Sequence, residues 1–78
     1  MNKITIYTTN SCTYCVKAKN LLDQKNLNYE EINVESKELR EKMKYKTGGR
    51  YTVPQIFIDN NYIGGYEDLY LYMTSNKN

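Results

Sequence analysis

Two cysteines, Cys12 and Cys15, are separated by two residues, and the chain has no others. They follow a short stretch rich in β-branched residues and open a segment with helical periodicity, so they are expected where a strand turns into a helix. A thiol must ionise before it attacks a disulfide, and unpaired N–H groups at a helix start stabilise the thiolate. Cys12 is therefore the expected nucleophile. Cys15, one turn further on the apolar face, is expected to be buried and to resolve the mixed disulfide.

Three other roles for these cysteines stay open at this point. A structural zinc site takes four ligands, usually cysteine and histidine, whereas this chain has two cysteines and no histidine. A disulfide that only stabilises the fold would close a short loop. By restricting the unfolded chain, such a loop adds about 2 kcal/mol to the free energy of unfolding. Two unrelated buried cysteines are the third possibility, although a position at the start of a helix favours redox chemistry.

Hydrophobic periodicity predicts the elements that must hold the pair in place. The expected strands cover residues 3–8, 29–34, 55–58 and 62–63, and the expected helices cover residues 13–26, 36–47 and 66–74. Ser36 is expected to cap the start of the second helix, and Gly48-Gly49 is expected to end it. Leu39 and Met43 are predicted on the buried side of that helix. The third helix should present one packed face, made of Tyr66, Leu69, Tyr70 and Met73.

The order strand-helix-strand-helix-strand-strand-helix predicts a single α/β domain over residues 1–78. A strand-helix-strand start implies a parallel pair, and the turn Asp59-Asn60-Asn61 adds an antiparallel hairpin. The result is a small four-stranded mixed sheet flanked by three helices. This is the thioredoxin-like fold, for which a Cys-x-x-Cys near such a unit is a sequence signature.

Composition excludes several other classes of function. With 11 basic and 9 acidic residues the net charge is +2, too little to indicate nucleic acid as a partner. Most of the nine tyrosines fall where a half-buried ring is expected. Neither a secretion signal nor a run long enough to cross a membrane is recognisable. We therefore expect a cytoplasmic protein in a reducing compartment, where paired cysteines are more often catalytic or metal-binding than structural.

Three segments together resemble the glutaredoxin family, and most closely its small bacterial dithiol members. They occur in the family's order and spacing, and read Cys12-Thr13-Tyr14-Cys15, Thr52-Val53-Pro54 and Gly64-Gly65-Tyr66-Glu67-Asp68-Leu69. The resemblance implies an enzyme that reduces protein disulfides and protein–glutathione mixed disulfides, with glutathione as electron donor. It also implies a monomer whose partners are glutathione and disulfide-containing or glutathionylated proteins.

The resemblance also assigns roles around the cysteines. Cys12 would become glutathionylated, Cys15 would resolve dithiol substrates, and Tyr14 would flank the glutathione sulfur. The loop Thr52-Val53-Pro54 would contain a cis proline, and the main chain of Val53 would pair with the cysteinyl part of glutathione. The γ-glutamyl end would bind at the last helix start, and Arg40 would face the glycine carboxylate. The residues implied at the helix start are Gly65, Tyr66, Glu67 and Asp68.

Each of these residues has a plainer interpretation that stays open. Tyr14 can be an exposed ring on the first helix turn, and Pro54 can simply start a strand. Glu67 and Asp68 complement a helix N-terminus whether or not a ligand binds. Arg40 can equally be a solvated surface residue.

Two positions depart from the family pattern. Many relatives have a lysine three residues before the first cysteine, where this chain has Thr9. The absence of this lysine puts in question how strongly the Cys12 thiolate is stabilised and how strongly glutathione binds. It favours the alternative that the chain is a redoxin reduced by thioredoxin reductase. Thr13 stands where proline is common. Members with a small polar residue there sometimes hold a [2Fe–2S] cluster in a glutathione-bridged dimer, with Cys12 as the ligand, so a cluster carrier is the other alternative.

Overall fold

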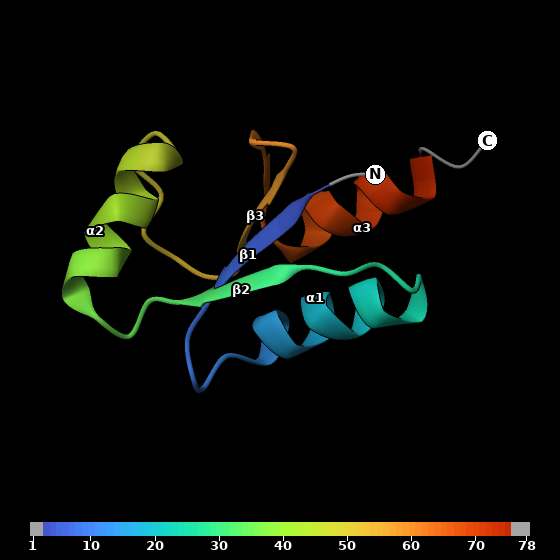
Figure 1. Cartoon of the computed structure of the whole chain (residues 1–78), viewed down its shortest axis with the longest axis horizontal. Coiled ribbons are helices and arrows are strands. Elements are labelled where there is room, and N and C mark those ends of the chain that lie inside the picture. Colours follow the sequence, from blue (N-terminus) through green and yellow to red (C-terminus); the bar gives the residue numbers. More distant parts are fainter. Residues whose placement is uncertain (1–2, 76–78) are drawn as a thin grey trace.

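A computed structural model describes residues 3–75 of the chain (Figure 1). The elements are β1 (Ile4–Thr8), α1 (Thr13–Gln24), β2 (Glu30–Asn33), α2 (Lys37–Lys46), β3 (Gln55–Ile58), β4 (Asn61–Gly64) and α3 (Tyr66–Ser75). The strands form one sheet in the order β2-β1-β3-β4. β1 runs parallel to β2 and antiparallel to β3, and β3 runs antiparallel to β4. The predicted mixed sheet with three helices is confirmed.

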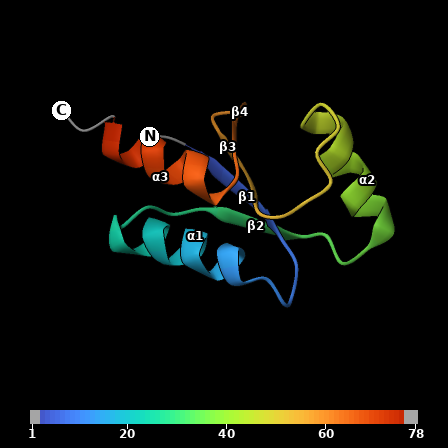
Figure 2. The same ribbon diagram turned by 180° about the vertical axis from the view of Figure 1, so that it is seen from behind.

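α1 and α3 pack side by side on one face of the sheet (Figures 1 and 2). Ile6 of β1 and Ile56 of β3 are direct register partners, and both are 0% exposed. Leu22 of α1 and Leu69 of α3 are equally buried and belong to the same core. Because both helices bury their apolar stripes on the same two strands, their positions relative to each other are set by this core.

The opposite face of the sheet carries a smaller core under α2. Tyr7, Val34 and Met43 form it, and the Phe57 ring meets the Tyr7 ring edge-on with centroids 5.8 Å apart. Met43 is 0% exposed as predicted, but Leu39, expected on the same side, is 37% exposed. Figure 1 shows that α2 reaches beyond the ends of the strands. A residue one turn from Met43 therefore has no sheet to pack on.

The helix boundaries differ from the expected ones by a few residues. α1 ends at Gln24 rather than at residue 26, because the N–H of Lys25 donates to two α1 carbonyls at 3.2 Å and Asn26 turns to φ 58°. Asparagine is one of the few residues that tolerates this left-handed region. The predicted signals around α2 are confirmed. The hydroxyl of Ser36 accepts from a backbone N–H of the helix at 3.4 Å, and Gly48 has φ 77° just after its end.

One expected core residue of α3 is on the surface instead. Tyr70 is 48% exposed, whereas Leu69 is 0% exposed and Tyr66 and Met73 are partly buried. α3 buries a narrow stripe, since residues three before and four after Leu69 share its side. Tyr70, the residue directly after Leu69, lies at the exposed edge of that stripe. Three further tyrosines are exposed, namely Tyr14, Tyr45 and Tyr51.

A polar cluster joins α1 to the first two strands. The Thr8 hydroxyl, in a residue that is 0% exposed, donates to Glu31 Oε2 at 2.7 Å. Lys19 of α1 donates to the same oxygen at 3.0 Å. The hydrogen bond from Thr8 and then that from Lys19 lower the pKa of the Glu31 carboxyl below its usual range. The charged form of Glu31 therefore stabilises the fold, and it ties α1 to the end of β1.

Within residues 3–75, every helix is too short or too polar to span a bilayer. A membrane-crossing helix needs about 20 mainly apolar residues, and α1 has 12.

Replacing Met43 by alanine should lower the free energy of unfolding by about 2–4 kcal/mol, since it leaves a cavity in the smaller core. The matched variant Leu39→Ala, on the same helix, should cost less than about 1 kcal/mol because that side chain is already exposed. Urea unfolding followed by circular dichroism measures both. Equal losses in the two variants would contradict the assignment of Met43 as the anchor of α2.

The stabilisation from Glu31 should depend on pH. Its pKa is lowered in the folded state, so the contribution is complete above the unfolded pKa of about 4.3. It is lost as the pH falls through the folded value. The stability difference between wild type and Glu31→Gln should therefore shrink between pH 7 and the acid range. Glu30→Gln, a neighbour whose side chain is 60% exposed, controls for removal of one negative charge. A Glu31→Gln difference that stays constant with pH would refute this role.

Candidate active site

Cys12 stands at the N-cap of α1, in the loop that leaves β1. Its backbone is extended, with φ −140° and ψ 107°, and its Sγ accepts from the N–H of Cys15 at 3.1 Å. The two residues form a disulfide, with Cα atoms 5.2 Å apart. Cys15 is 1% exposed and belongs to the buried side of α1, whereas Cys12 is half-buried. Therefore only Cys12 can react with the sulfur of another molecule, either as the attacking thiolate or as the sulfur that is attacked.

The electrostatics at Cys12 favour a negative sulfur once the disulfide is reduced. A helix N-terminus presents unpaired N–H groups and the positive end of the helix dipole. The first turn of α1 contains no acidic residue to oppose it. The N–H of Cys15 already points at the Cys12 sulfur. This combination is what a nucleophilic cysteine needs.

The loop before Cys12 is held by polar contacts with the segment after β2. The N–H of Asn10 donates to Glu35 Oε2 at 2.8 Å, and the Asn33 side-chain amide donates to Asn10 Oδ1 at 2.7 Å. The N–H of Val34 donates to the carbonyl of Thr8 at 2.7 Å. These contacts fix where the chain leaves β1 and so where α1 begins. Nothing in the local sequence pattern indicates them, because they join residues far apart in the chain.

The loop before β3 lies against the nucleophile. The Val53–Pro54 peptide bond is cis, as the resemblance implied, and the carbonyl oxygen of Val53 lies 3.8 Å from Cys12 Sγ. The buried side chain of Gln55, 2% exposed, donates to the carbonyl of Thr52 at 2.9 Å and accepts from the Tyr62 hydroxyl at 2.5 Å. Gln55 therefore links this loop to the β4 strand behind it.

The third part of the site is the start of α3. Asp68 Oδ2 accepts from the N–H of Gly65 at 3.1 Å, so this carboxylate caps the helix. A Cβ on Gly64, which has φ +130°, would lie in the place of the Asp68 carboxylate. A Cβ on Gly65 would come 3.5 Å from the carbonyl of Pro54. Gly64 thus leaves room for the Asp68 cap, whereas the contact at Gly65 is of ordinary van der Waals length and shows that the helix start lies next to the loop at Pro54.

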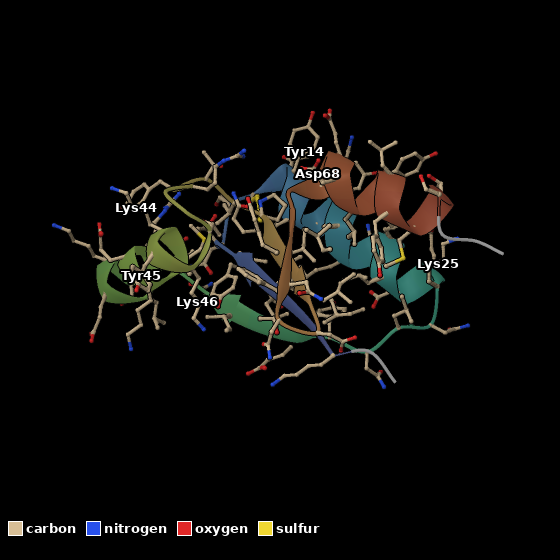
Figure 3. All side chains as sticks on the ribbon, turned by 90° about the horizontal axis from the view of Figure 1, so that it is seen from above. Tyr14, Lys25, Lys44, Tyr45, Lys46 and Asp68 are labelled. Atoms are coloured by element: carbon tan, nitrogen blue, oxygen red, sulfur yellow. A yellow bond between two sulfur atoms is a disulfide. The ribbon has the colours of Figure 1, made fainter. Side chains whose placement is uncertain are left out.

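These parts surround one open cleft of about 340 Å³. It brings together eight of the residues that the sequence singled out: Tyr14, Thr52, Val53, Pro54, Gly65, Tyr66, Glu67 and Asp68. Cys12 meets the cleft at Val53, through the contact given above. In Figure 3, Tyr14 and Asp68 are labelled close together at the ends of α1 and α3.

Arg40 is the one residue predicted to bind glutathione that does not line the cleft. Its Nε donates to the carbonyl of Tyr51 at 3.0 Å, and its guanidinium lies 4.9 Å from the centre of the Tyr51 ring. Lys44 approaches the same ring at 5.6 Å. Arg40 therefore supports the segment that leads into the Thr52 loop, and its charge is engaged there.

Arg50 and Gln55 line the cleft, and sequence reasoning missed both. Their nearness in sequence to the Thr52-Val53-Pro54 loop could have indicated them. Arg50 precedes Thr52 by two residues, and Gln55 follows Pro54 directly. Burial raises the pKa of the Tyr62 phenol, which the positive charge of Arg50 opposes and the negative charge of Asp68 increases. The lining of the cleft thus contains one cation, Arg50, and two carboxylates, Glu67 and Asp68.

The described residues contain no cluster of typical metal ligands. Between residues 3 and 75 there is no group of three or more Cys, His, Asp or Glu side chains arranged to hold an ion. Of the two cysteines only Cys12 is accessible, so a cluster bound through Cys12 would need its other ligands from other molecules.

The arrangement can therefore carry out thiol–disulfide exchange. A half-buried sulfur at a helix N-terminus, a buried partner within bonding distance and an adjoining cleft are the parts that this chemistry requires. The cleft offers backbone groups beside the sulfur and charged groups of both signs further away.

Comparison with known proteins gives one consistent family. A family model described as Glutaredoxin matches residues 4–63. Glutaredoxin 1 of Rickettsia prowazekii (strain Madrid E) is 56% identical over 72 residues, which cover 90% of this chain and 76% of that protein. The crystal structure of glutaredoxin 1 from Francisella tularensis complexed with cacodylate superposes with a TM-score of 0.83 at 33% identity, covering 96% of this chain and 95% of the other.

A second solved structure is the crystal structure of a buckwheat glutaredoxin–glutathione complex, with a TM-score of 0.82 at 25% identity. The match covers 95% of this chain and 71% of that one. Sequence and fold agree, and the chain belongs to the glutaredoxin family.

Proposed function

We propose that this chain is a glutathione-dependent thiol–disulfide oxidoreductase that reduces protein disulfides and removes glutathione from mixed disulfides. The observation that carries the proposal is the disulfide of half-buried Cys12 and buried Cys15, placed beside a cleft. The buckwheat relative is described in complex with glutathione, which supports glutathione as the small thiol. The proposed setting is a monomer in the cytoplasm.

Removal of glutathione would need Cys12 alone. Its thiolate attacks the glutathione sulfur of a mixed disulfide, the old S–S bond breaks, and the protein thiolate leaves and takes up a proton. The thiolate of a second glutathione then attacks the sulfur of the bound glutathione. Oxidised glutathione leaves and the Cys12 thiolate is restored, so each cycle consumes one free glutathione, and the other half of the oxidised glutathione comes from the mixed disulfide itself.

Reduction of a protein disulfide would also use Cys15. Cys12 first forms a mixed disulfide with one substrate sulfur. The Cys15 thiolate then attacks Cys12 Sγ, which releases the reduced protein and leaves the internal disulfide seen in the structure. Two glutathione molecules reduce that bond again. Burial of Cys15 keeps this second attack intramolecular, and a neighbouring thiol has a very high effective concentration.

The residues around the cleft suit glutathione in one orientation, with its cysteinyl unit beside Cys12 and its γ-glutamyl end at the start of α3. The backbone of Val53, beside Cys12, would pair with the cysteinyl unit. The N–H groups of Tyr66 and Glu67 at the start of α3 would bind the γ-glutamyl carboxylate. Asp68 caps this helix through one oxygen, and its carboxylate would also attract the ligand's ammonium group.

Arg50 is the better candidate for the glycine carboxylate. It lines the cleft, whereas Arg40 is occupied by the Tyr51 carbonyl and ring outside it. An arginine offers a carboxylate several N–H donors in one plane. We therefore assign the role expected for Arg40 to Arg50.

Replacing Cys12 by serine should lower turnover in a glutathione-reductase-coupled assay by at least about 1,000-fold, because the attacking sulfur is lost. Cys15→Ser should keep removal of glutathione from a small mixed disulfide within about tenfold of wild type. The same variant should lose protein-disulfide reduction, since the resolving thiol is absent. Loss of activity in Cys15→Ser but not in Cys12→Ser would reverse the two roles.

The two arginines can be separated by the same assay. Arg50→Ala should raise KM for glutathione about tenfold, the effect of one charge-assisted contact near the surface, and Arg50→Lys should restore part of it. Arg40→Ala should change KM less than about threefold. A larger rise in KM for Arg40→Ala than for Arg50→Ala would show that Arg40, and not Arg50, binds the glycine carboxylate.

The two alternative functions have their own readouts. A redoxin served by thioredoxin reductase would turn over with that enzyme and not with glutathione. A cluster carrier would become coloured and dimeric after anaerobic reconstitution with iron, sulfide and glutathione. A colourless monomer that is active with glutathione supports the proposal over both.

A further inference from the structure

The buried amide of Gln55 connects the β3–β4 hairpin to the loop beside Cys12. Gln55 is 2% exposed, and its Nε2 donates to the carbonyl oxygen of Thr52 at 2.9 Å and to the Thr52 hydroxyl at 3.3 Å. Its Oε1 accepts from the Tyr62 hydroxyl at 2.5 Å. Both ends of the amide are therefore bonded inside the protein, and a role for Gln55 has to act through Thr52.

The bond to the Thr52 carbonyl also sets the direction of the next N–H in the chain. That carbonyl and the N–H of Val53 belong to one peptide unit, which is planar and trans. In a trans unit the C=O and the N–H point in opposite directions. Holding the Thr52 carbonyl towards Gln55 therefore aims the Val53 N–H to the other side, and the Val53 backbone is the group offered to the cysteinyl unit of glutathione.

The Tyr62 hydroxyl determines which end of the amide faces Thr52. A carbonyl oxygen only accepts hydrogen bonds, so the NH₂ group of Gln55 must face Thr52 and its oxygen must face a donor. The Tyr62 phenol is that donor. Burial raises the pKa of this phenol, so it keeps its proton at neutral pH. Without the hydroxyl, Gln55 Oε1 loses its partner and the amide is free to turn.

The sheet holds Tyr62 in the position that this contact requires. Tyr62 of β4 and Phe57 of β3 are register partners, and their ring centroids are 5.3 Å apart. Side chains alternate along a strand, so Gln55, two residues before Phe57, projects from the same face of the sheet. The Phe57 ring packs in turn on Tyr7 in the smaller core. The hydroxyl of Tyr62 is thus fixed by packing.

These bonds end beside the reacting sulfur. The Val53 carbonyl lies 3.8 Å from Cys12 Sγ, and Gln55 itself lines the cleft. Resting on the proposed function, we propose that Gln55 and Tyr62 are positioning residues for glutathione. Gln55 aims the Val53 N–H at the cysteinyl unit by holding the Thr52 carbonyl, and Tyr62 acts only through Gln55 by fixing the direction of its amide.

The first test measures kcat and KM for the mixed disulfide of glutathione and 2-mercaptoethanol in the glutathione-reductase-coupled assay. Gln55→Met keeps the length of the side chain and removes the amide. It should raise KM about tenfold, because one oriented donor is lost from binding. It should leave kcat within about twofold, since this donor binds the substrate and the transition state alike.

Tyr62→Phe should raise KM about threefold in the same assay, because the amide of Gln55 is still present but less firmly oriented. The double variant Gln55→Met with Tyr62→Phe should show the tenfold rise of Gln55→Met alone. Independent effects would multiply to about thirtyfold. The comparison of single and double variants therefore tests whether Tyr62 acts through Gln55.

Two controls separate positioning from a general change of the site. Tyr7→Phe removes a hydroxyl from the neighbouring ring, which packs on Phe57 outside the cleft, and should change neither constant. Alkylation of reduced Cys12 by iodoacetamide needs the sulfur but no bound glutathione, and its rate should stay within about twofold in every variant. Circular dichroism shows whether each variant is folded.

A second measurement follows the Val53 N–H directly. In Cys15→Ser, Cys12 can be held as a mixed disulfide with glutathione, because the resolving thiol is absent. The Val53 amide should then exchange with deuterium at least about tenfold more slowly than in the unmodified variant, as a hydrogen-bonded amide does. Adding Gln55→Met should remove most of this protection. Nuclear magnetic resonance measures the exchange residue by residue.

Each further outcome has one meaning. If wild type does not turn over the mixed disulfide, the proposed function fails and the inference fails with it. If wild type is active but Gln55→Met leaves KM and the Val53 exchange unchanged, Gln55 supports only the fold and the inference is refuted. Equal falls in kcat and in the iodoacetamide rate would also refute it, since the whole site is then altered.

The Tyr62 variant keeps the inference testable by itself. If Gln55→Met does not fold, an unchanged KM in Tyr62→Phe refutes the positioning role, and a rise of about threefold with an unchanged kcat supports it. A thirtyfold effect in the double variant would show that Tyr62 acts independently of Gln55 and would refute their connection.

Discussion

The site depends on the burial of α1 and α3 against the same two strands. Leu22 and Leu69 share one core with Ile6 and Ile56, and burying side chains of this size contributes about 1.5–3 kcal/mol each. This packing brings two helix N-termini to one edge of the sheet. Each helix start is a place where negative charge is stabilised, and here one carries the reactive sulfur while the other adjoins the cleft.

The loop at Pro54 joins the two helix starts into one site. Its Val53 carbonyl lies against Cys12, and its Pro54 carbonyl lies close to Gly65 at the start of α3. Gln55 holds the loop from behind through buried hydrogen bonds, and buried polar groups are costly unless they are paired. The reacting sulfur and the cleft therefore keep a fixed relation, which is the condition for orienting a disulfide for in-line attack.

The differences between expectation and structure have physical causes in particular residues. Local periodicity placed Leu39 and Tyr70 inside, but α2 reaches beyond the sheet and α3 buries only a narrow stripe. The likeness to the family pointed to Arg40 for a cleft that Arg50 lines instead. Gln55 looked like an ordinary strand residue, because its partner Tyr62 is known only once the hairpin is folded.

By itself the sequence determined the strand and helix order, the pairing of Cys12 with Cys15 and their unequal burial, while the loop at Pro54 was implied by the family resemblance. These features follow from short-range spacing, capping and backbone restriction, which act within a few residues. Only the tertiary structure decided which arginine lines the cleft, what anchors the Cys12 loop, and that the Tyr66 ring lies next to the rings of Tyr14 and Tyr70. Those relations join residues tens of positions apart, and packing of the helices on the sheet sets them.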